Sequence, residues 1–219
     1  MRDVDDLGAR LVQLVIALVV MGLALALIVQ ADLGLDPWNV FHQGLSERTG
    51  IGLGWVVILA SGVILLLWIP LRQRPGIGTV LNAILVGLFI EVGVAVLPSP
   101  SGLAARVAFL VVGIVINGIT IGMYIGAGLG PGPRDGVMTG LAARGHSVRV
   151  VRTGIELTAL ATGVLLGGSV GIGTVVFALT VGPIVHVTLP RFDRTARGSS
   201  PWTRQSPAAS GPSTSRSMP

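Results

Sequence analysis

Six apolar segments of about 20 residues recur along the chain and limit what it can fold into. A helix of that length crosses the roughly 30 Å hydrocarbon core of a bilayer, where every backbone polar group must be satisfied internally. Charged residues make up only 11% of the sequence, too few to cover a water-soluble domain. We therefore predict an all-α membrane protein embedded in the lipid bilayer, with about six spans near 11–31, 53–70, 79–97, 104–127, 151–168 and 173–189.

The two ends of the chain are interpreted differently. The first apolar segment is too long for the core of a signal peptide, and acidic residues at positions 3, 5 and 6 replace the basic start that such a peptide needs. Residues 1–190 are therefore predicted to form a single polytopic domain. Residues 191–219 are rich in Arg, Ser and Pro and have few apolar side chains, which predicts a disordered cytoplasmic tail.

The 15 basic residues, all arginines, predict the orientation. If the six spans alternate in direction, 13 arginines lie on one side and only Arg48 and Arg106 lie on the other. Because positively charged loops stay inside, both termini are predicted to be cytoplasmic in the cell membrane. The sequence pI of about 11.4 reflects these flanking arginines. No basic face with interleaved aromatic residues is present, so we expect no nucleic-acid partner.

The chain contains an internal repeat. Residues 31–48 match residues 127–144 at a shift of 96, and GIGTV at 76–80 recurs unchanged at 171–175, a shift of 95. The repeats cover about 11–97 and 104–189, with three spans each. Because three is odd, the second copy enters the membrane from the opposite side, which predicts inverted topology. Secondary transporters are commonly built this way, with their site between the repeats. A non-catalytic membrane scaffold or regulatory protein is the alternative.

Four motifs carry a resemblance to a known family. They are LGLDPWNVFHQGL at 33–45, LGPGPRDGVMTGL at 129–141, SVRVVRTGIE at 147–156 and GGSVGIGT at 167–174. Together they resemble bacterial integral membrane proteins of the YczE/YitT type, in particular the YczE-like branch. The resemblance covers about residues 10–190. It implies a multi-span membrane protein with a transporter-like role and specifies no substrate.

The segments after spans one and four each predict a short helix. Asp36 can cap a helix that has Pro37 at its first position, and Gly132 with Pro133 offers the same geometry. Each helix would have about ten residues, too few to span, and would be interfacial or re-entrant. Trp38 is interpreted as an anchor at the membrane surface or as a stacking surface for a solute.

Charged and polar residues of these segments form the candidate site. Arg134, Asp135, Arg152 and Glu156 are expected on one side of the membrane, with Arg152 and Glu156 four residues apart on one helix face. They form either a gate for a small polar or anionic solute or a salt-bridge network in which Arg134 pairs with Asp135 or Glu156. The full set proposed to line a solute path or gate is Asp36, Trp38, Asn39, Arg134, Asp135, Arg152 and Glu156.

Two ionisable residues fall inside predicted spans. Glu91 lies in the third span, and its repeat partner is His186 in the sixth. Such groups are costly in lipid and face a bundle interior or a cavity, so both are candidates for a proton path. The alternative is that each sits near a membrane surface.

The sequence offers no basis for catalysis or for a cofactor. Cysteine is absent, and the three histidines match no metal-ligand spacing, so no metal site is expected. No predicted span contains an aspartate, which argues against an intramembrane aspartyl protease. We therefore expect neither an enzyme nor a cofactor-binding protein.

Overall fold

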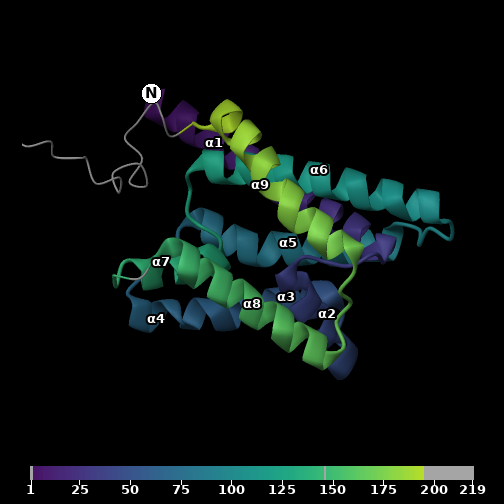
Figure 1. Ribbon diagram of the computed structural model, residues 1–219. Helices are drawn as coiled ribbons and strands as arrows, with labels where there is room; N and C mark the ends of the chain where they lie inside the picture. Colours follow the sequence, from purple (N-terminus) through teal and green to yellow (C-terminus); the bar gives the residue numbers. More distant parts are fainter. Residues whose placement is uncertain (1, 146, 195–219) are drawn as a thin grey trace, which may run out of the picture.

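The computed structural model describes residues 2–145 and 147–194, and within them helices joined by loops are the only regular secondary structure (Figure 1). The prediction of an all-α protein is therefore confirmed. In chain order the helices are α1 Arg2–Ala31, α2 Pro37–Thr49, α3 Leu53–Leu66, α4 Trp68–Leu71, α5 Ile77–Val96, α6 Leu103–Ala127, α7 Pro133–Ala142, α8 Val148–Leu166 and α9 Ile172–Phe192.

Five helical segments are long and apolar enough to cross a membrane: α1, α3 with α4, α5, α6 and α9. The fifth predicted span, 151–168, is helical as α8, but it does not meet the same criterion. Arg149, Arg152 and Glu156 occupy its first turns and leave an uncharged stretch too short to span. In the internal repeat, α8 is the counterpart of α3 and α4. All six predicted long segments are therefore helical, and five of them meet the length and hydropathy criterion for a membrane span.

The two repeats run in opposite directions, as predicted. α1 and α6 pack along each other, with the start of each beside the end of the other (Figure 1). Arg10 donates to the carbonyls of Ala127 and Gly128 at 2.8 and 2.9 Å, and its counterpart Arg106 donates to Ala31 at 2.8 Å. These arginines satisfy carbonyls that the helix ends leave unpaired. Each repeat therefore makes the same contact with the other: an arginine near the start of its first long helix donates to carbonyls at the end of the first long helix of the other repeat.

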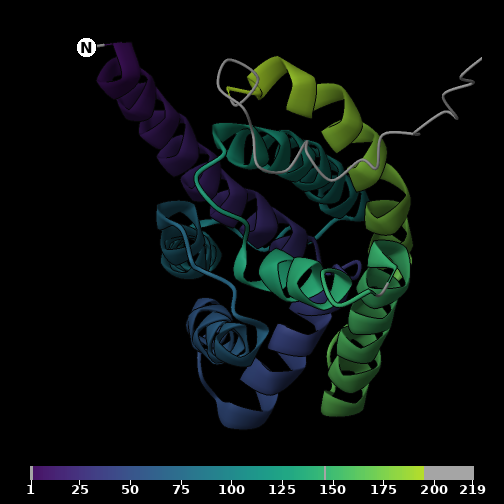
Figure 2. The same cartoon turned by 90° about the vertical axis from the view of Figure 1, so that its left-hand side faces the viewer.

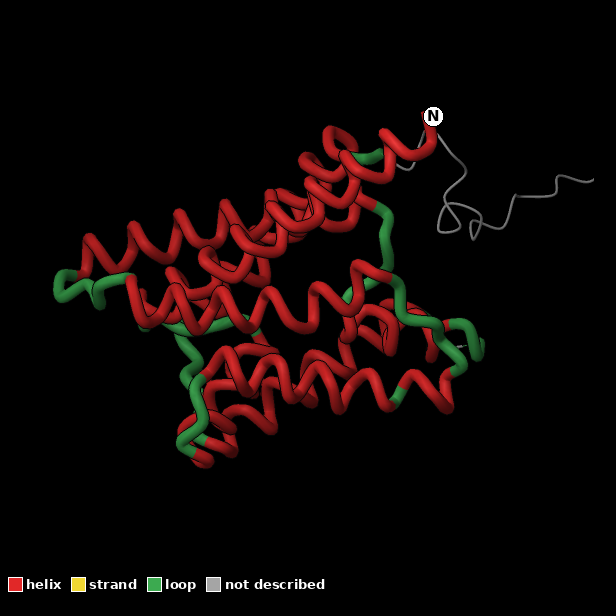
Figure 3. Tube along the Cα trace, turned by 180° about the vertical axis from the view of Figure 1, so that it is seen from behind, coloured by secondary structure: helices red, strands yellow, loops and turns green. Residues whose placement is uncertain are grey.

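A second exchanged contact joins the loops to the last helix of each repeat. The Gly78 amide donates to Leu129 at 2.9 Å, and the Gly173 amide donates to Leu33 at 2.7 Å. Each bond runs from one repeat to the other. The halves are therefore interlocked through the loops that join their helices; Figure 3 shows these loops among the helices.

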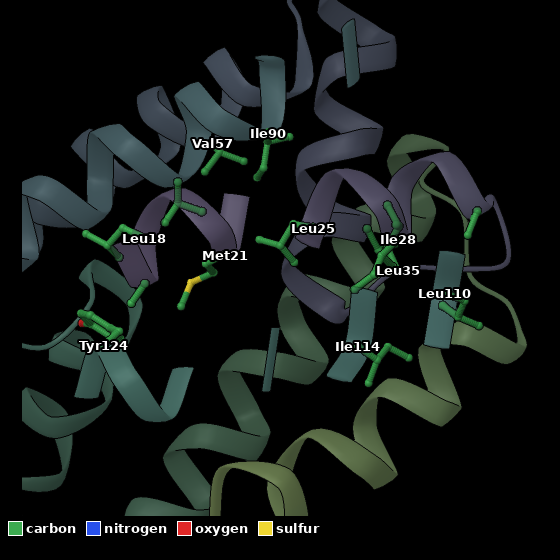
Figure 4. Packing of buried hydrophobic residues seen from close by; sticks show 14 of the residues in the cluster. Leu18, Met21, Leu25, Ile28, Leu35, Val57, Ile90, Leu110, Ile114 and Tyr124 are labelled. Carbon is green, nitrogen blue, oxygen red and sulfur yellow. The ribbon is translucent and has the colours of Figure 1, made fainter. Parts of the chain in front are cut away.

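The apolar core is built around α1, which α5 and α6 flank. Leu14, Leu18, Leu25 and Ile28 of α1 are buried, and Ile114 of α6 packs with them (Figure 4). In a bilayer, tight packing and interhelical hydrogen bonds take over much of the role that water exclusion has in soluble cores. The centre of the molecule is thus a packed support for the remaining helices.

The two halves differ in how their middle helices pack. α3 lies along α5, where Gly87 contacts it so closely that a Cβ atom there would overlap the backbone of Gly54 and lie 2.6 Å from Ile58 Cγ1. Its counterpart α8 instead packs along α2 and diverges from α9 after their connecting turn (Figures 1 and 2). At Gly182, the counterpart of Gly87 on α9, a Cβ would meet no atom of the described part of the chain within 4 Å.

The C-terminal boundary lies slightly later than predicted. α9 continues to Phe192, and the Arg194 amide donates to Gly126 at 2.9 Å. Arg194 Nε also donates to Gln13 at 2.6 Å. Residues 191–194 are therefore ordered, because they close onto the end of α6. The rest of the predicted disordered tail, 195–219, lies outside the described residues.

Candidate functional site

The short helix α2 begins as predicted. Asp36 is its N-cap, Pro37 occupies the first turn, and the Asn39 amide donates to the Asp36 carboxylate at 3.4 Å. In α7, Gly132 and Pro133 have the same places. The predicted repeat thus extends to the local geometry of both helix starts.

The starts of α2 and α7 meet between the two repeats. Arg134 Nη1 of α7 lies 3.8 Å from Asp36 Oδ2, and the Arg134 guanidinium lies 5.2 Å from the ring centre of Trp38. This cation–π geometry is favourable when the pair is partly shielded from water. The expectation that Arg134 would pair with Asp135 or Glu156 is wrong, because its ion-pair partner is Asp36. Trp38 stacks on a cation supplied by the protein itself.

Asp135 occupies the position of Asn39 in the second repeat. Among the described residues no cation lies within 4 Å of its carboxylate, although the Gly132 backbone donates a hydrogen bond to it. The side chain is exposed, yet protein surrounds it and displaces much of its water. This desolvation raises the pKa of Asp135, and the positive charges of Arg134 and Arg152 oppose the rise.

Arg152 and Glu156 form the predicted pair on α8. Arg152 Nε lies 2.9 Å from Glu156 Oε1; the Arg152 side chain is 63% exposed and the Glu156 side chain 36%. Exposed pairs of this spacing stabilise a helix by only about 0.3–0.5 kcal/mol. The charges of both residues reach Asp135, so the structure brings the predicted charged group together at one end of α8.

A buried polar row extends from Asp36 into α2. Asn39 Nδ2 donates to the Asp36 carboxylate, and His42 Nδ1 lies 3.4 Å from Asn39 Oδ1. Asn39 and His42 are each only 1% exposed. Burial lowers the pKa of His42, and the charge of Arg134 lowers it further. His42 was missed as a site residue because a single histidine on a short helix has no distinctive sequence pattern.

Two buried nitrogens in and beside this row have no hydrogen-bond partner among the described residues. They are His42 Nε2 and the indole Nε1 of Trp38. Buried polar groups are nearly always paired, because an unpaired donor costs about 1–3 kcal/mol. Their position beside Arg134 makes the start of α2 a place where a polar solute group could bind.

The start of α7 is fixed by residues that the sequence did not single out. Trp68 Nε1 donates to Pro133 at 3.0 Å, Tyr124 Oη donates to Gly130 at 3.2 Å, and Thr79 Oγ1 donates to Pro131 at 2.7 Å. The repeated GIGTV motif was the available signal for Thr79. Nothing comparable marked Trp68, whose side chain is buried against Gly136.

The first ten residues of α2 are buried or half-buried, because the helix packs along α8 with Asn39, Val40, His42 and Gly44 buried. Gly163 of α8 and Gly168, in the turn after it, approach the α2 backbone so closely that a side chain at either position would overlap it. A helix lying on the membrane surface would leave one face to lipid headgroups. The burial therefore favours the re-entrant alternative for α2.

A hollow of about 330 Å³ lies between α2 and α8. Trp38 and Phe41 line it from α2, and Ile155, Thr158 and Ala159 line it from α8. The lining is mainly apolar, and the volume is at the lower end for pockets that hold small molecules. The hollow borders Trp38, on which Arg134 stacks, so it adjoins the charged group.

Glu91 and His186 are not brought together. Glu91 Oε2 accepts a hydrogen bond from the Gly54 amide at 2.9 Å, which satisfies the start of α3. His186 lies exposed on α9, and α5 and α9 do not pack along each other. The contact of Glu91 supports a structural role, while the proton path stays a prediction. No group of three or more His, Asp or Glu residues in the described part could hold a metal ion.

The fold and its motifs define a multi-pass, all-α membrane protein made of two inverted halves. The chain matches the sequence family described as a family of unknown function, DUF6198, over residues 8–190, and it belongs to that family. An uncharacterized protein of Haemophilus influenzae is 41% identical over 177 residues, covering 80% of this chain and 81% of the relative.

Two relatives come from Bacillus subtilis. The uncharacterized membrane protein YczE is 33% identical over 177 residues, covering 80% of this chain and 82% of YczE. The uncharacterized protein YyaS is 25% identical over 186 residues, covering 82% of this chain and 92% of YyaS. The resemblance to the YczE-like branch is therefore confirmed. No solved structure matches the chain.

Proposed function

We propose that this protein moves a small solute through the interface of its two inverted repeats. The observation that carries the proposal is the meeting of two short helices, one from each repeat, at Asp36 and Arg134. Asn39 and Asp135 stand at equivalent positions on them. Secondary transporters bind solutes at such half-helix starts, where backbone amides and the helix dipole face a cavity.

The unequal packing of the halves supports movement. α3 lies on α5, whereas the equivalent face of α9 around Gly182 is uncovered. Because the two inverted repeats pack their helices differently, exchanging the two packings gives a second state of the molecule. In it the first repeat packs as the second repeat does here, and the second as the first. In that state α8 lies on α9, and α3 leaves α5. Exchange between the two states would open the repeat interface to each side in turn.

Loss of the Arg134 charge tests the proposal. Proteoliposomes containing the full chain are screened for uptake of small charged and polar solutes, and each flux is compared with that of Arg134→Gln. We expect flux to fall at least tenfold with little change in melting temperature, because Arg134 borders the solute site. Arg74→Gln, at an exposed position between α4 and α5, is the matched control and should retain flux.

A structural role for Arg134 predicts another result. Its removal would leave the buried Asp36 carboxylate without a cation, and a buried pair that loses one partner costs about 3–5 kcal/mol. Melting temperature and flux would then fall together, and Asp36→Asn would restore both in the double variant. That outcome removes Arg134 from the site, and a complete absence of flux for all solutes would favour a membrane scaffold.

We also propose that the protein lies in the cell membrane with both termini in the cytoplasm. The arginine distribution supports this, because the described segments that carry ten of these 13 arginines, the start of α1, the connections around α4 to α5 and α7 to α8, and the end of α9, gather at one end of the bundle (left in Figure 1). The chain has no cysteine, so single cysteines can be labelled without background. Cysteine at Ser46 or Ser101 should react with an impermeant reagent outside intact cells.

Cysteine at Gln73 or Ala143 should react only after the membrane is opened. The reason is that these positions lie at the arginine-rich end, whereas Ser46 and Ser101 lie at the opposite end. Labelling of Ser101→Cys and Ala143→Cys from the same side of intact cells would contradict the orientation, since the inverted repeat requires them to face opposite sides.

A further inference from the structure

We infer that the hollow between α2 and α8 binds an amphipathic cation, with the cationic group at Asp135 and the apolar body against Trp38 and Phe41. This inference rests on the proposed function and names the solute class. The sequence suggested an anionic solute. The structure favours a cation instead, because it shows which charged side chains at the site already have ion-pair partners.

The positive charges at the site already have partners. Arg152 is paired with Glu156 at 2.9 Å, and Arg134 is held between Asp36 and the Trp38 ring. A bound anion would have to displace one of these contacts. Neither arginine is therefore available in the way that free recognition of a carboxylate or phosphate would require.

The helix starts are also satisfied by the protein's own acids. Asp36 accepts the Asn39 amide at the start of α2, and Asp135 accepts a bond from the Gly132 backbone at the start of α7. A carboxylate at a helix start offsets the positive end of the helix dipole. The two helix starts therefore attract a solute anion less than bare helix ends would.

The charge that remains is negative. Around the site stand three acids, Asp36, Asp135 and Glu156, against the two arginines. Among the described residues only Asp135 of these five has no oppositely charged group within 4 Å, and its side chain is exposed. An ammonium group would supply the missing ion pair and so fits the electrostatics better than a second anion.

The hollow suits an apolar body attached to that cation. Trp38 and Phe41 present aromatic surfaces, while Ile155 and Ala159 provide aliphatic ones. Glu156 follows Ile155 directly, and Asp135 follows Arg134, whose guanidinium touches Trp38. Neither acid lines the hollow itself, but the charges of Arg134 and Glu156 both reach Asp135, which places the acids near the part of the hollow that Trp38 and Ile155 line. The unpartnered Trp38 indole N–H offers a further donor for a polar atom of the solute.

Three probes that share a phenethyl body and differ in the charge of the end group test the inference: phenethylammonium, 2-phenylethanol and 3-phenylpropionate. Binding is measured by titration calorimetry on the full chain in detergent. We expect phenethylammonium to bind at least tenfold more tightly than the alcohol, with 3-phenylpropionate weakest. In Asp135→Asn the preference for the ammonium over the alcohol should be lost, because only the ion pair is removed.

Two further variants separate the site from general effects. Ala159→Phe fills the hollow and should abolish binding of phenethylammonium and 2-phenylethanol alike, whereas Glu47→Gln, an exposed acid at the far end of α2, should change nothing. Monodisperse elution and an unchanged melting temperature confirm that each variant is folded. If Asp135→Asn is not folded, the comparison of the three probes on the unaltered chain decides by itself.

Preference for 3-phenylpropionate, equal binding of all three probes, or no binding of any would overturn the inference. Binding is measured without a membrane, so its outcome is independent of transport. Ammonium binding without flux in proteoliposomes would retain the site and reject the proposed transport. Flux of an anion without ammonium binding would do the reverse.

Discussion

Replacing Gly130 with valine is expected to abolish folding. Gly130 has φ +128°, which side chains rarely adopt, and a Cβ there would lie 2.9 Å from Thr79 Oγ1 and 3.1 Å from Gly76 Cα. The backbone strain costs about 1–3 kcal/mol and the overpacking a similar amount. Together they take up much of the stability of a typical domain. Yield of monodisperse protein and melting temperature measure the effect.

Gly34 provides a repeat of the same experiment. It has φ +107° and packs against Gly171 as Gly130 packs against Gly76, so Gly34→Val should be equally damaging. Gly62→Val is the matched control, because a Cβ at Gly62 meets no atom within 4 Å and the residue lies in an apolar helix. A stable Gly130→Val protein would show that the loop and the start of α5 do not need their close contact.

The glycine and proline pattern allowed the frame of this fold to be predicted. Gly34 and Gly130 recur at the same place because both loops need the same backbone shape, and Pro37 and Pro133 recur because both short helices begin there. These requirements are local and therefore visible in the sequence. The number and direction of the long helices followed from apolar segment length in the same way.

The pairing of charged residues could not be predicted in the same way. Arg134 pairs with Asp36, about a hundred residues away, because the two short helices meet start to start across the repeats. The sequence placed Arg134 with its local neighbours, Asp135 and Glu156. Only the Arg152–Glu156 pair, which lies within one helix turn, was found correctly. Tertiary packing therefore determines which charged side chain is left without an ion-pair partner, and the sequence pattern does not show that packing.

The unequal halves were also hidden from the sequence. α3 and α8 are equivalent at a shift of 95, since the left-handed residue that follows each segment, Arg72 and Gly167, recurs at that spacing. Matching residues alone suggest that both helices pack alike. The observed difference arises because Gly163 lets α8 approach α2, whereas its counterpart Trp68 fills the space against Gly136.

A disulfide between cysteines at positions 153 and 182 is expected to form only if the protein reaches the second state. Thr153 and Gly182 correspond to Ile58 and Gly87, which touch in the first repeat. Gly182 now has no neighbour within 4 Å, and Thr153 is exposed. Disulfides need Cβ atoms about 3.5–4.5 Å apart, so the structure described here does not allow this bond.

The experiment uses Thr153→Cys/Gly182→Cys in proteoliposomes with a mild oxidant, and gel mobility after protease cleavage between α8 and α9 reports the crosslink. We expect most molecules to crosslink within minutes, because exchange between states is much faster than oxidation. Ile58→Cys/Gly87→Cys is the control and should crosslink without exchange between states, since those residues already touch and only a small shift of α3 is needed to admit the Gly87 Cβ beside Gly54. Crosslinking of the control pair alone would mean that α8 stays on α2 and that the asymmetry is fixed. Crosslinking of both pairs, with flux lost on oxidation and restored by reduction, would show that the uncovered face of α9 receives α8 during transport.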